Sequence, residues 1–218
     1  MCSPGVVIRA ARFANFGSVS YYPGMPALHD KLISPEEYLA GELLSPIKHE
    51  YLGGVVHAMA GAKNVHNEIA GNVFLAVGTR LRGKKCRPYN SDTKVRVRMP
   101  NQLRFYYPDV QVVCDPNDRD DSFQDRPLVI IEVLSPSTRR VDESEKLDAY
   151  QTIPSLEVYL IVDSTHARVV VYRRTATGFT REVFHGTEGS IELDCIGIEL
   201  PLAEIYERTD FPPLEVVE

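Results

Sequence analysis

The stretch Pro127-Leu128-Val129-Ile130-Ile131-Glu132-Val133-Leu134 is an apolar run of strand length that carries a single carboxylate. Its β-branched residues favour a buried strand over a helical segment of the same length. A carboxylate that is buried without a partner is costly. Glu132 therefore needs a counterpart, and three alternatives stand: a metal ion, a basic side chain, or backbone amides.

A second carboxylate, Asp109, follows Pro108 at the start of another apolar segment, which we predict to be a strand over roughly 105–114. If this strand neighbours the one at 127–134, Asp109 and Glu132 converge on one ion. A hard divalent cation such as Mg²⁺ takes carboxylates, a backbone carbonyl and waters as ligands. Without Glu132, Asp109 would be interpreted as an ordinary turn residue.

A helix predicted at about 142–152 follows the second strand. Asp142, Lys146 and Tyr150 are spaced by four residues and share one face of it. A lysine beside a bound ion can orient or deprotonate a water, or stabilise charge that develops on a phosphate. The alternatives are a solvated helix lysine for Lys146 and core packing for Tyr150.

The remaining pattern mixes helical and extended segments. We predict helices that begin at Ser34-Pro35 and over about 64–82, a hairpin over 51–59 that turns at Gly53-Gly54, and strands at 94–98, 157–163, 168–174, 179–184 and 190–194. This order indicates an α/β or α+β class with a mixed sheet. We divide the chain into a loosely structured arm (1–30), one domain (31–207) and a C-terminal tail (208–218).

The charge distribution is uneven. The net charge of the 218 residues is −6, yet residues 80–104 hold nine basic residues against Asp92 alone, so this stretch carries +8 and the remainder −14. Within it the strand at 94–98 is predicted to point Lys94, Arg96 and Arg98 outward. Such a basic strip can contact DNA phosphates, although a solvated face is the simpler interpretation.

The four cysteines, Cys2, Cys86, Cys114 and Cys195, are scattered and form no C-x-x-C pair. This spacing argues against a zinc site or a disulfide framework and favours reduced thiols. No apolar run approaches the length of a membrane span, and the N-terminus lacks the apolar core of a secretory signal. We therefore expect a cytoplasmic protein without a membrane partner.

Three segments resemble the Uma2 endonuclease family of the PD-(D/E)xK restriction-endonuclease-like superfamily: Pro108-Asp109, the string at 131–138 (IEVLSPST), and Asp142…Lys146…Tyr150. The resemblance covers roughly residues 33–205. It implies a restriction-endonuclease-like core, a mixed β-sheet flanked by helices. It further implies that Asp109, Glu132 and the carbonyl of Val133 bind the metal, with Glu50 as an additional acidic residue and His66 in an accessory role.

One position departs from the superfamily motif. Leu134 stands where the motif has its lysine, and in this branch the lysine looks relocated to the following helix as Lys146. This relocation keeps an ammonium near the ion only if the helix packs over the strand ends.

The sequence thus predicts a magnesium-dependent endonuclease that hydrolyses DNA phosphodiester bonds, with Mn²⁺ as a substitute ion. Asp109, Glu132, Lys146 and Glu50 would be catalytic, and Tyr150 accessory. By analogy with other nucleases we expect a homodimer, for which the exposed strands and the apolar stretch 211–214 could form the interface. Two alternatives remain: a DNA-binding or regulatory module on the same fold that does not cut, and a hydrolase of small phosphoesters.

Overall fold

The computed structural model describes residues 32–134 and 141–211, with the backbone alone for 141–143. The strands of these residues form a six-stranded sheet, a five-stranded sheet and a small two-stranded sheet. The helices are α1 (Pro35–Glu42), α2 (Asn64–Arg80), the π-helix η1 (Val141–Lys146), α3 (Leu147–Gln151), the short 3₁₀ helix η2 (Asp194–Ile196) and α4 (Leu202–Ile205). The predicted arm, residues 1–30, lies outside the described residues.

The six-stranded sheet has the order β11-β10-β9-β8-β6-β3. Its strands are β3 (Arg87–Asn90), β6 (Val110–Val113), β8 (Pro127–Leu134), β9 (Val158–Asp163), β10 (Arg168–Thr175) and β11 (Gly178–His185). β8 and β9 run parallel, and the other pairs are antiparallel. The predicted mixed sheet is therefore confirmed, and the apolar stretch β8 lies inside it with both faces covered.

The five-stranded sheet has the order β2-β1-β5-β4-β7. Its strands are β1 (His49–Leu52), β2 (Val55–Ala58), β4 (Lys94–Met99), β5 (Gln102–Tyr106) and β7 (Phe123–Gln124), and the two-stranded sheet pairs β12 (Ser190–Leu193) with β13 (Ile198–Pro201). The predicted hairpin at Gly53-Gly54 joins β1 to β2, and both glycines have a positive φ. The helix start at Ser34 is also confirmed, with a full capping box to Glu37.

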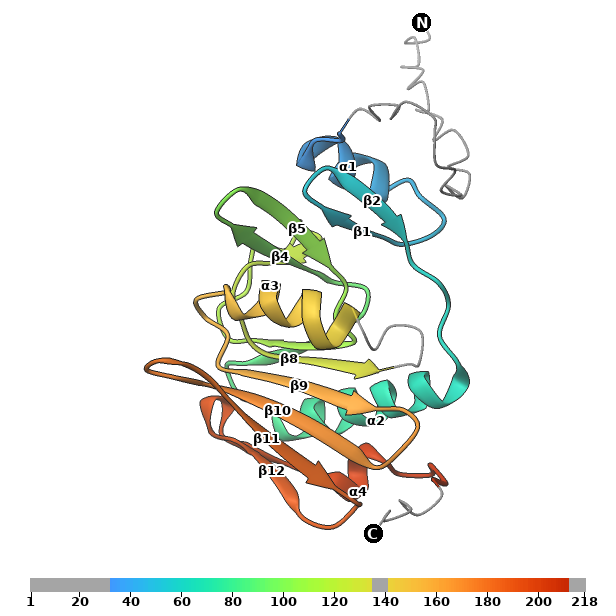
Figure 1. Cartoon of the computed structure of the whole chain (residues 1–218), viewed down its shortest axis with the longest axis vertical. Coiled ribbons are helices and arrows are strands. Elements are labelled where there is room, and N and C mark those ends of the chain that lie inside the picture. Colours follow the sequence, from blue (N-terminus) through green and yellow to red (C-terminus); the bar gives the residue numbers. More distant parts are fainter. Residues whose placement is uncertain (1–31, 135–140, 212–218) are drawn as a thin grey trace, which may run out of the picture.

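Alternation along β8 divides the core into layers. Ile131 and Val133 belong to a cluster with α2, whereas Ile130 and Leu134 belong to one that includes α3 and the five-stranded sheet. Figure 1 shows α3 lying between the strands of the two sheets, with α2 on the far side of the six-stranded one. A side chain on α3 or η1 can therefore reach both sheets.

The predicted strand 105–114 is two strands in the structure. Residues 105–106 belong to β5 in one sheet, and 110–113 form β6 in the other. Pro108 lies between them, lacks an N–H for a sheet ladder, and stands where the chain crosses from one sheet to the other. Asp109 is consequently placed at this crossing. The helix predicted over 142–152 begins as the π-helix η1, and the side chain of Asp142 lies outside the described part.

The prediction that all cysteines are reduced is wrong. Cys86 and Cys114 form a disulfide, with their Cα atoms 3.8 Å apart. The cause is the edge strand β3, which the sequence analysis did not predict. β3 pairs antiparallel with β6, Arg87 opposite Val113, so the two cysteines just outside that pair face each other.

At the C-terminal end, Phe211 packs edge-on against Tyr206, with ring centroids 5.5 Å apart. The rest of the stretch 211–214 that was predicted as an interface lies outside the described residues. No helix in the described part of the chain is long and apolar enough to cross a membrane.

Candidate active site

The two predicted carboxylates lie across from each other where β6 and β8 run side by side. β6 and β8 pair antiparallel with Val110 opposite Ile131, so Asp109 and Glu132 come next along the same ladder. Asp109 Oδ2 accepts a hydrogen bond from the amide of Val133 at 2.8 Å. The condition set in the sequence analysis, that the two strands are neighbours, is met.

Glu132 is 3% exposed and has protein partners for its charge. Its Oε1 accepts hydrogen bonds from Tyr150 Oη at 2.8 Å and from Lys146 Nζ at 3.1 Å. Of the three alternatives for this buried carboxylate, a basic side chain is therefore present, supplemented by a hydroxyl. Tyr150 is fully buried, and burial followed by the negative charge of Glu132 raises the pKa of its hydroxyl, which keeps it a hydrogen-bond donor.

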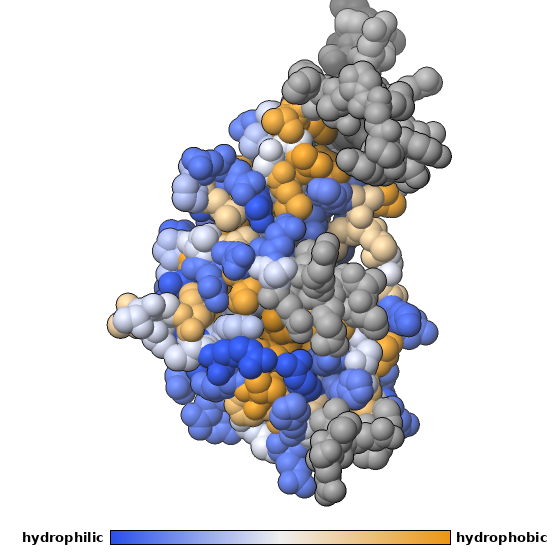
Figure 2. Space-filling model, in the orientation of Figure 1, coloured by the Kyte–Doolittle hydropathy of each residue, from blue (hydrophilic) through white to orange (hydrophobic). Residues whose placement is uncertain are grey.

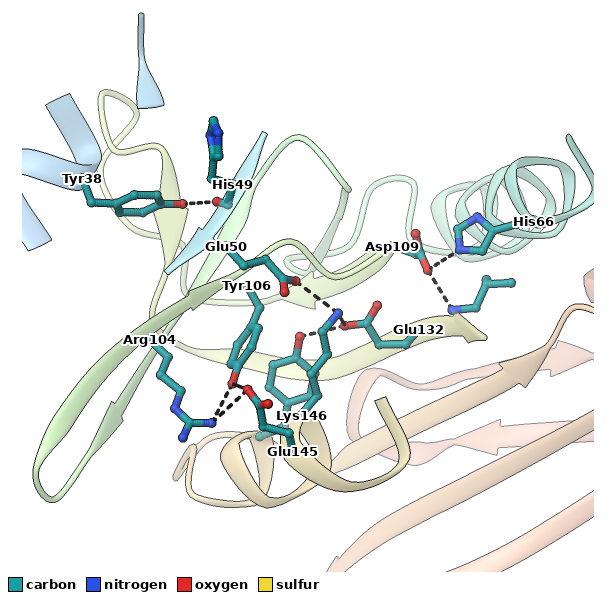
Figure 3. Close-up of polar contacts among 12 residues, drawn as sticks. Tyr38, His49, Glu50, His66, Arg104, Tyr106, Asp109, Glu132, Glu145 and Lys146 are labelled. Carbon is teal, nitrogen blue, oxygen red and sulfur yellow. Dashed lines mark hydrogen bonds and ion pairs between the residues drawn. The ribbon is translucent and has the colours of Figure 1, made fainter. Parts of the chain in front are cut away.

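Lys146 joins the two sheets. Its ammonium lies 3.1 Å from Glu132 Oε1 on β8 and 3.2 Å from Glu50 Oε1 on β1. Figure 3 shows the two carboxylates approaching the lysine from opposite sides. The Lys146 side chain is 9% exposed, so water screens these contacts little. The helix does pack over the strand ends, as the relocated lysine requires.

His66, near the start of α2, faces Asp109. Its Nε2 lies 3.3 Å from Asp109 Oδ2, and its Nδ1 is buried without a hydrogen-bond partner among the described residues. Burial by itself lowers the pKa of His66, but the hydrogen bond and charge of Asp109, with help from Asn67 and Glu132, outweigh it and leave the pKa raised. The Asp109 carboxylate thus stabilises the protonated form of the imidazole relative to a free histidine.

These side chains line one cleft of about 540 Å³ between the two sheets and the start of α2. The polar residues around it are Lys48, Glu50, His57, His66, Asn67, Ser91, Tyr107, Asp109, Glu132 and Lys146. The apolar wall comes from Ile47 and the connection 58–62. A cleft of this size with convergent charged groups is the form expected of a ligand-binding site.

A second group of contacts, which the sequence analysis did not predict, fixes one wall of the cleft. The buried carboxylate of Glu42, at the end of α1, accepts hydrogen bonds from the amide of His49 (2.8 Å) and from Tyr107 Oη (2.8 Å). His49 Nδ1 lies 3.0 Å from the same carboxylate. The only sequence signal was that Tyr107 directly precedes Pro108-Asp109. These contacts join α1, β1 and the crossing that carries Asp109.

A family model described as "Uma2: Putative restriction endonuclease" matches residues 35–203. The chain belongs to the Uma2 family. Two uncharacterized proteins of Synechocystis sp. are relatives. One is 34% identical over 180 residues, 82% of this chain and 94% of the relative. The other is 30% identical over 147 residues, 66% of this chain and 82% of the relative.

A solved structure, described as "a putative nuclease belonging to DUF820" from Anabaena variabilis, superimposes on this Uma2 member with a TM-score of 0.62. The identity is 15%, and the match covers 78% of this chain and 95% of the other. At that identity the likeness shows the fold. The predicted α/β, restriction-endonuclease-like core is confirmed.

The cationic face predicted on β4 of this Uma2 protein is largely internal. Lys94 is 3% exposed, lies against the ring of Tyr107 and donates to Ser122 Oγ at 3.2 Å. Burial accordingly lowers the pKa of its amine. Lys94 is thus not on an outer face, contrary to the prediction, because Tyr107 and Ser122 cover that side of β4.

The other two predicted DNA contacts differ from each other. Arg96 makes a bidentate pair with Asp125, at 2.7 and 2.6 Å, and its side chain is 21% exposed. Arg98 lies 3.9 Å from the same carboxylate and is 65% exposed. The acidic partners of the basic strip come from distant parts of the sequence, which counting charges along the chain cannot show.

The Arg96–Asp125 pair leads to a prediction about acid stability. Burial alone raises the pKa of Asp125, but the hydrogen bonds from Arg96 and Asn117 outweigh it, so the pKa lies below its usual 3.8. A carboxyl group with a depressed folded pKa contributes stability above its unfolded pKa and loses it as the pH falls through the folded value. Asp125→Asn is therefore expected to cost about 1–3 kcal/mol of unfolding free energy at pH 7.

This cost should shrink steadily as the pH falls below 3.8, because the wild-type carboxyl group then also becomes neutral. Urea unfolding of both proteins between pH 3 and pH 7 measures the difference. A difference that stays constant over this range would show that the charge of Asp125 contributes nothing.

Proposed function

We propose that this Uma2 protein is a metal-dependent endonuclease that hydrolyses DNA phosphodiester bonds. One observation carries the proposal: carboxylates from two different sheets, Glu50 and Glu132, meet one buried ammonium, Lys146, in the cleft that Asp109 also lines. A structural ion pair needs one carboxylate for one lysine. The second carboxylate, together with Asp109, is suited to a cation, and the ammonium to a phosphate.

The residues fit a divalent cation of the magnesium type. Among the side chains that the structure describes, no three His, Cys, Asp or Glu residues stand together as a ready metal site. Mg²⁺, however, is commonly held by one or two carboxylates with waters and substrate phosphates completing its shell. Asp109 and Glu132 would supply those carboxylates, with the carbonyl of Val133 and Glu50 as further ligands, and Mn²⁺ would substitute.

A divalent cation bound there would polarise the phosphate and favour deprotonation of a water. The chain's own residues act around it. The amide of Val133 and the His66 imidazole hold Asp109 in one orientation, and Tyr150 holds Glu132. Lys146, held beside Glu132, stabilises negative charge on the scissile phosphate or orients the attacking water.

For the partner, we propose DNA contacted through its phosphates. Of the three predicted contact residues, Arg98 has a side chain exposed enough to reach a DNA phosphate without rearrangement. Lys94 and Arg96 would act by shaping the strand that presents it. Phosphate contacts of this kind position the DNA without reading its sequence.

We also propose a homodimer, since cutting both strands requires two sites. Of the seven large hydrophobic side chains exposed in the described part, five come from residues 32–55: Leu32, Leu43, Leu44, Ile47 and Val55. Figure 2 shows apolar residues gathered over α1 and the β1–β2 hairpin at one end of the molecule. Apolar surface of this kind commonly marks an interface, so it replaces the tail 211–214 as our candidate.

The test is a titration of Mg²⁺ and Mn²⁺ into the wild type and into Asp109→Ala/Glu132→Ala, together with a plasmid-nicking assay. The wild type should bind metal and nick, and the double variant should do neither. A matched control, Glu182→Ala/Glu192→Ala, removes two carboxylates from β11 and β12 and should behave as the wild type.

The other outcomes separate the alternatives. Metal binding without nicking would favour a DNA-binding or regulatory module that does not cut. A wild type that binds no metal would mean that Glu132 is only the structural partner of Lys146, and the proposal would be wrong.

A further inference from the structure

A second polar cluster lies directly beside the candidate site. It consists of Arg104 and Tyr106 on β5 and Glu145 on η1, the residue before Lys146 (Figure 3). Arg104 Nη1 donates to Tyr106 Oη at 2.8 Å and lies 3.4 Å from Glu145 Oε1. Tyr106 Oη donates to the same Glu145 oxygen at 3.2 Å. The cluster therefore ties the end of the π-helix to the central strand of the five-stranded sheet.

Tyr106 also touches both groups that hold Glu132. Its ring centroid lies 5.8 Å from Lys146 Nζ, and the ring packs edge-on against Tyr150 at 5.4 Å. Its side chain is fully buried. One aromatic residue thus supports the ammonium by a cation–π contact and supports the hydroxyl that donates to Glu132.

The register of the sheet explains why β5 can do this. Tyr51 and Leu52 of β1 stand opposite Phe105 and Arg104, so Glu50 comes next to Tyr106 on the face that meets η1. Glu50 and the Arg104 cluster therefore approach the helix from the same side. Lys146 directly follows Glu145, so contacts that hold Glu145 in place also restrict the position of the Lys146 backbone.

Stability alone does not explain the cluster. The Nε of Arg104 is buried and has no hydrogen-bond partner among the described residues, which is a cost. Glu145 is 39% exposed, so solvent weakens its pairing with Arg104. Lysine, in contrast, has a long flexible side chain whose ammonium must be held within a narrow region to act on a phosphate.

We propose that Arg104, acting through Glu145 and Tyr106, is a positioning residue that holds Lys146 in place for cleavage. The inference rests on the proposed function, in which Lys146 acts on the scissile phosphate. It adds Arg104 on β5, a residue that is not itself a proposed metal ligand. Loss of its side chain affects the chemistry without removing any group that would touch metal or DNA.

The first experiment measures single-turnover nicking at saturating metal and DNA. Arg104→Met and Glu145→Gln are expected to lower the rate about 10- to 100-fold, the effect of misplacing a catalytic group by around 1 Å. The Kd for Mn²⁺ and the KM for DNA should stay within roughly twofold of the wild type, since no ligand changes. Arg104→Lys, which keeps a cation, should recover part of the rate.

Matched controls come from the far edge of the six-stranded sheet. Arg173 is 24% exposed and contacts Glu182, which is 44% exposed, at 3.2 Å. Arg173→Met and Glu182→Gln therefore remove a comparable pair at a distance from the cleft, and both should nick at the wild-type rate.

The second experiment needs no activity. Lys146 and Lys94 are both buried, and both should react slowly with an amine-acetylating reagent. In Arg104→Met and Glu145→Gln, acetylation of Lys146, followed by mass spectrometry, should become several-fold faster, while Lys94 stays protected. Faster reaction of both lysines would mean general loosening and would overturn the positioning role.

The two experiments separate this inference from the proposed function. If the wild type does not nick, the proposed function is wrong. The selective acetylation of Lys146 then still decides whether Arg104 positions it. If the wild type nicks and Arg104→Met nicks equally fast with Lys146 still protected, the inference is wrong and the proposed function stands.

Discussion

Replacing Lys146 with methionine should lower the rate of DNA nicking by about 10²- to 10³-fold, the usual loss when one electrostatic group is removed from the reacting centre. Methionine has a similar length and fills a similar space, so packing against Tyr106 is largely kept. The substitution removes the positive charge of the ammonium, which lies where water screens it little. Nicking of a plasmid under single-turnover conditions measures the loss.

The same substitution should strengthen metal binding. In the wild type the ammonium lies 3.1 and 3.2 Å from two carboxylates and competes with a divalent cation for them. Without it, Glu50 and Glu132 face each other with less positive charge between them, which destabilises the metal-free fold. Added Mg²⁺ should therefore raise the Tm of Lys146→Met more than that of the wild type.

Two results would contradict this account. Nicking within tenfold of the wild type would mean that Lys146 is only a structural counter-ion. A Tm that does not respond to Mg²⁺ in either protein, together with unchanged titration heats, would mean that no divalent cation binds between these carboxylates.

Much of the candidate site follows from local sequence. Glu132 is conspicuous because an apolar strand of that length is buried on both faces, and Asp109 because its strand begins just after a proline. Lys146 needed the resemblance to the Uma2 family as well, since a lysine on a helix is otherwise unremarkable. The structure brings all three to one cleft.

The division into two sheets could not be predicted. It depends on strands too short to show a pattern, such as the two-residue β7, and on β3, which contains a proline and pairs at an edge. Because β3 was not predicted, the disulfide between Cys86 and Cys114 was not predicted either. Glu50 and Glu132 lie in different sheets because of strand pairings between segments that are distant in the sequence. The hydrophobic periodicity of a single segment does not show which segments pair.

The prediction that Lys94, Arg96 and Arg98 point outward is correct for Arg98 and wrong for Lys94, for a related reason. Alternation along β4 correctly placed Val95 and Val97 in the core, but it cannot show what covers the other face. Lys94 is buried there and Arg96 is paired with Asp125. A charge pattern along one strand indicates which residues share a face, and only the tertiary structure shows whether that face meets solvent.

Tyr150→Ala is expected to have the largest effect on stability. The side chain is fully buried. Its ring centroid lies 5.4 Å from that of Tyr106 and 5.2 Å from that of Tyr159. Truncating a buried aromatic residue costs about 3–5 kcal/mol. That is a large part of the 5–15 kcal/mol that typically holds a domain together. Urea unfolding followed by circular dichroism measures it.

Tyr150→Phe isolates the hydroxyl. It keeps the ring and removes only the hydrogen bond to Glu132, so it should cost about 1–3 kcal/mol, the range for a hydrogen bond to a charged group. Tyr172 provides the control for the aromatic row, because its ring stacks on Tyr159 at 6.1 Å but it is only half-buried. Tyr172→Ala should cost clearly less than Tyr150→Ala.

The comparison of the two Tyr150 variants decides what the residue does at the site. If Tyr150→Phe unfolds like the wild type yet nicks more slowly, the hydroxyl serves Glu132 and its hydrogen bond is functional. If its stability falls as far as that of Tyr150→Ala, Glu132 depends on this hydroxyl to remain buried. A Tyr150→Ala variant as stable as the wild type would instead show that the two sheets do not pack through this residue, and the layered core described above would have to be revised.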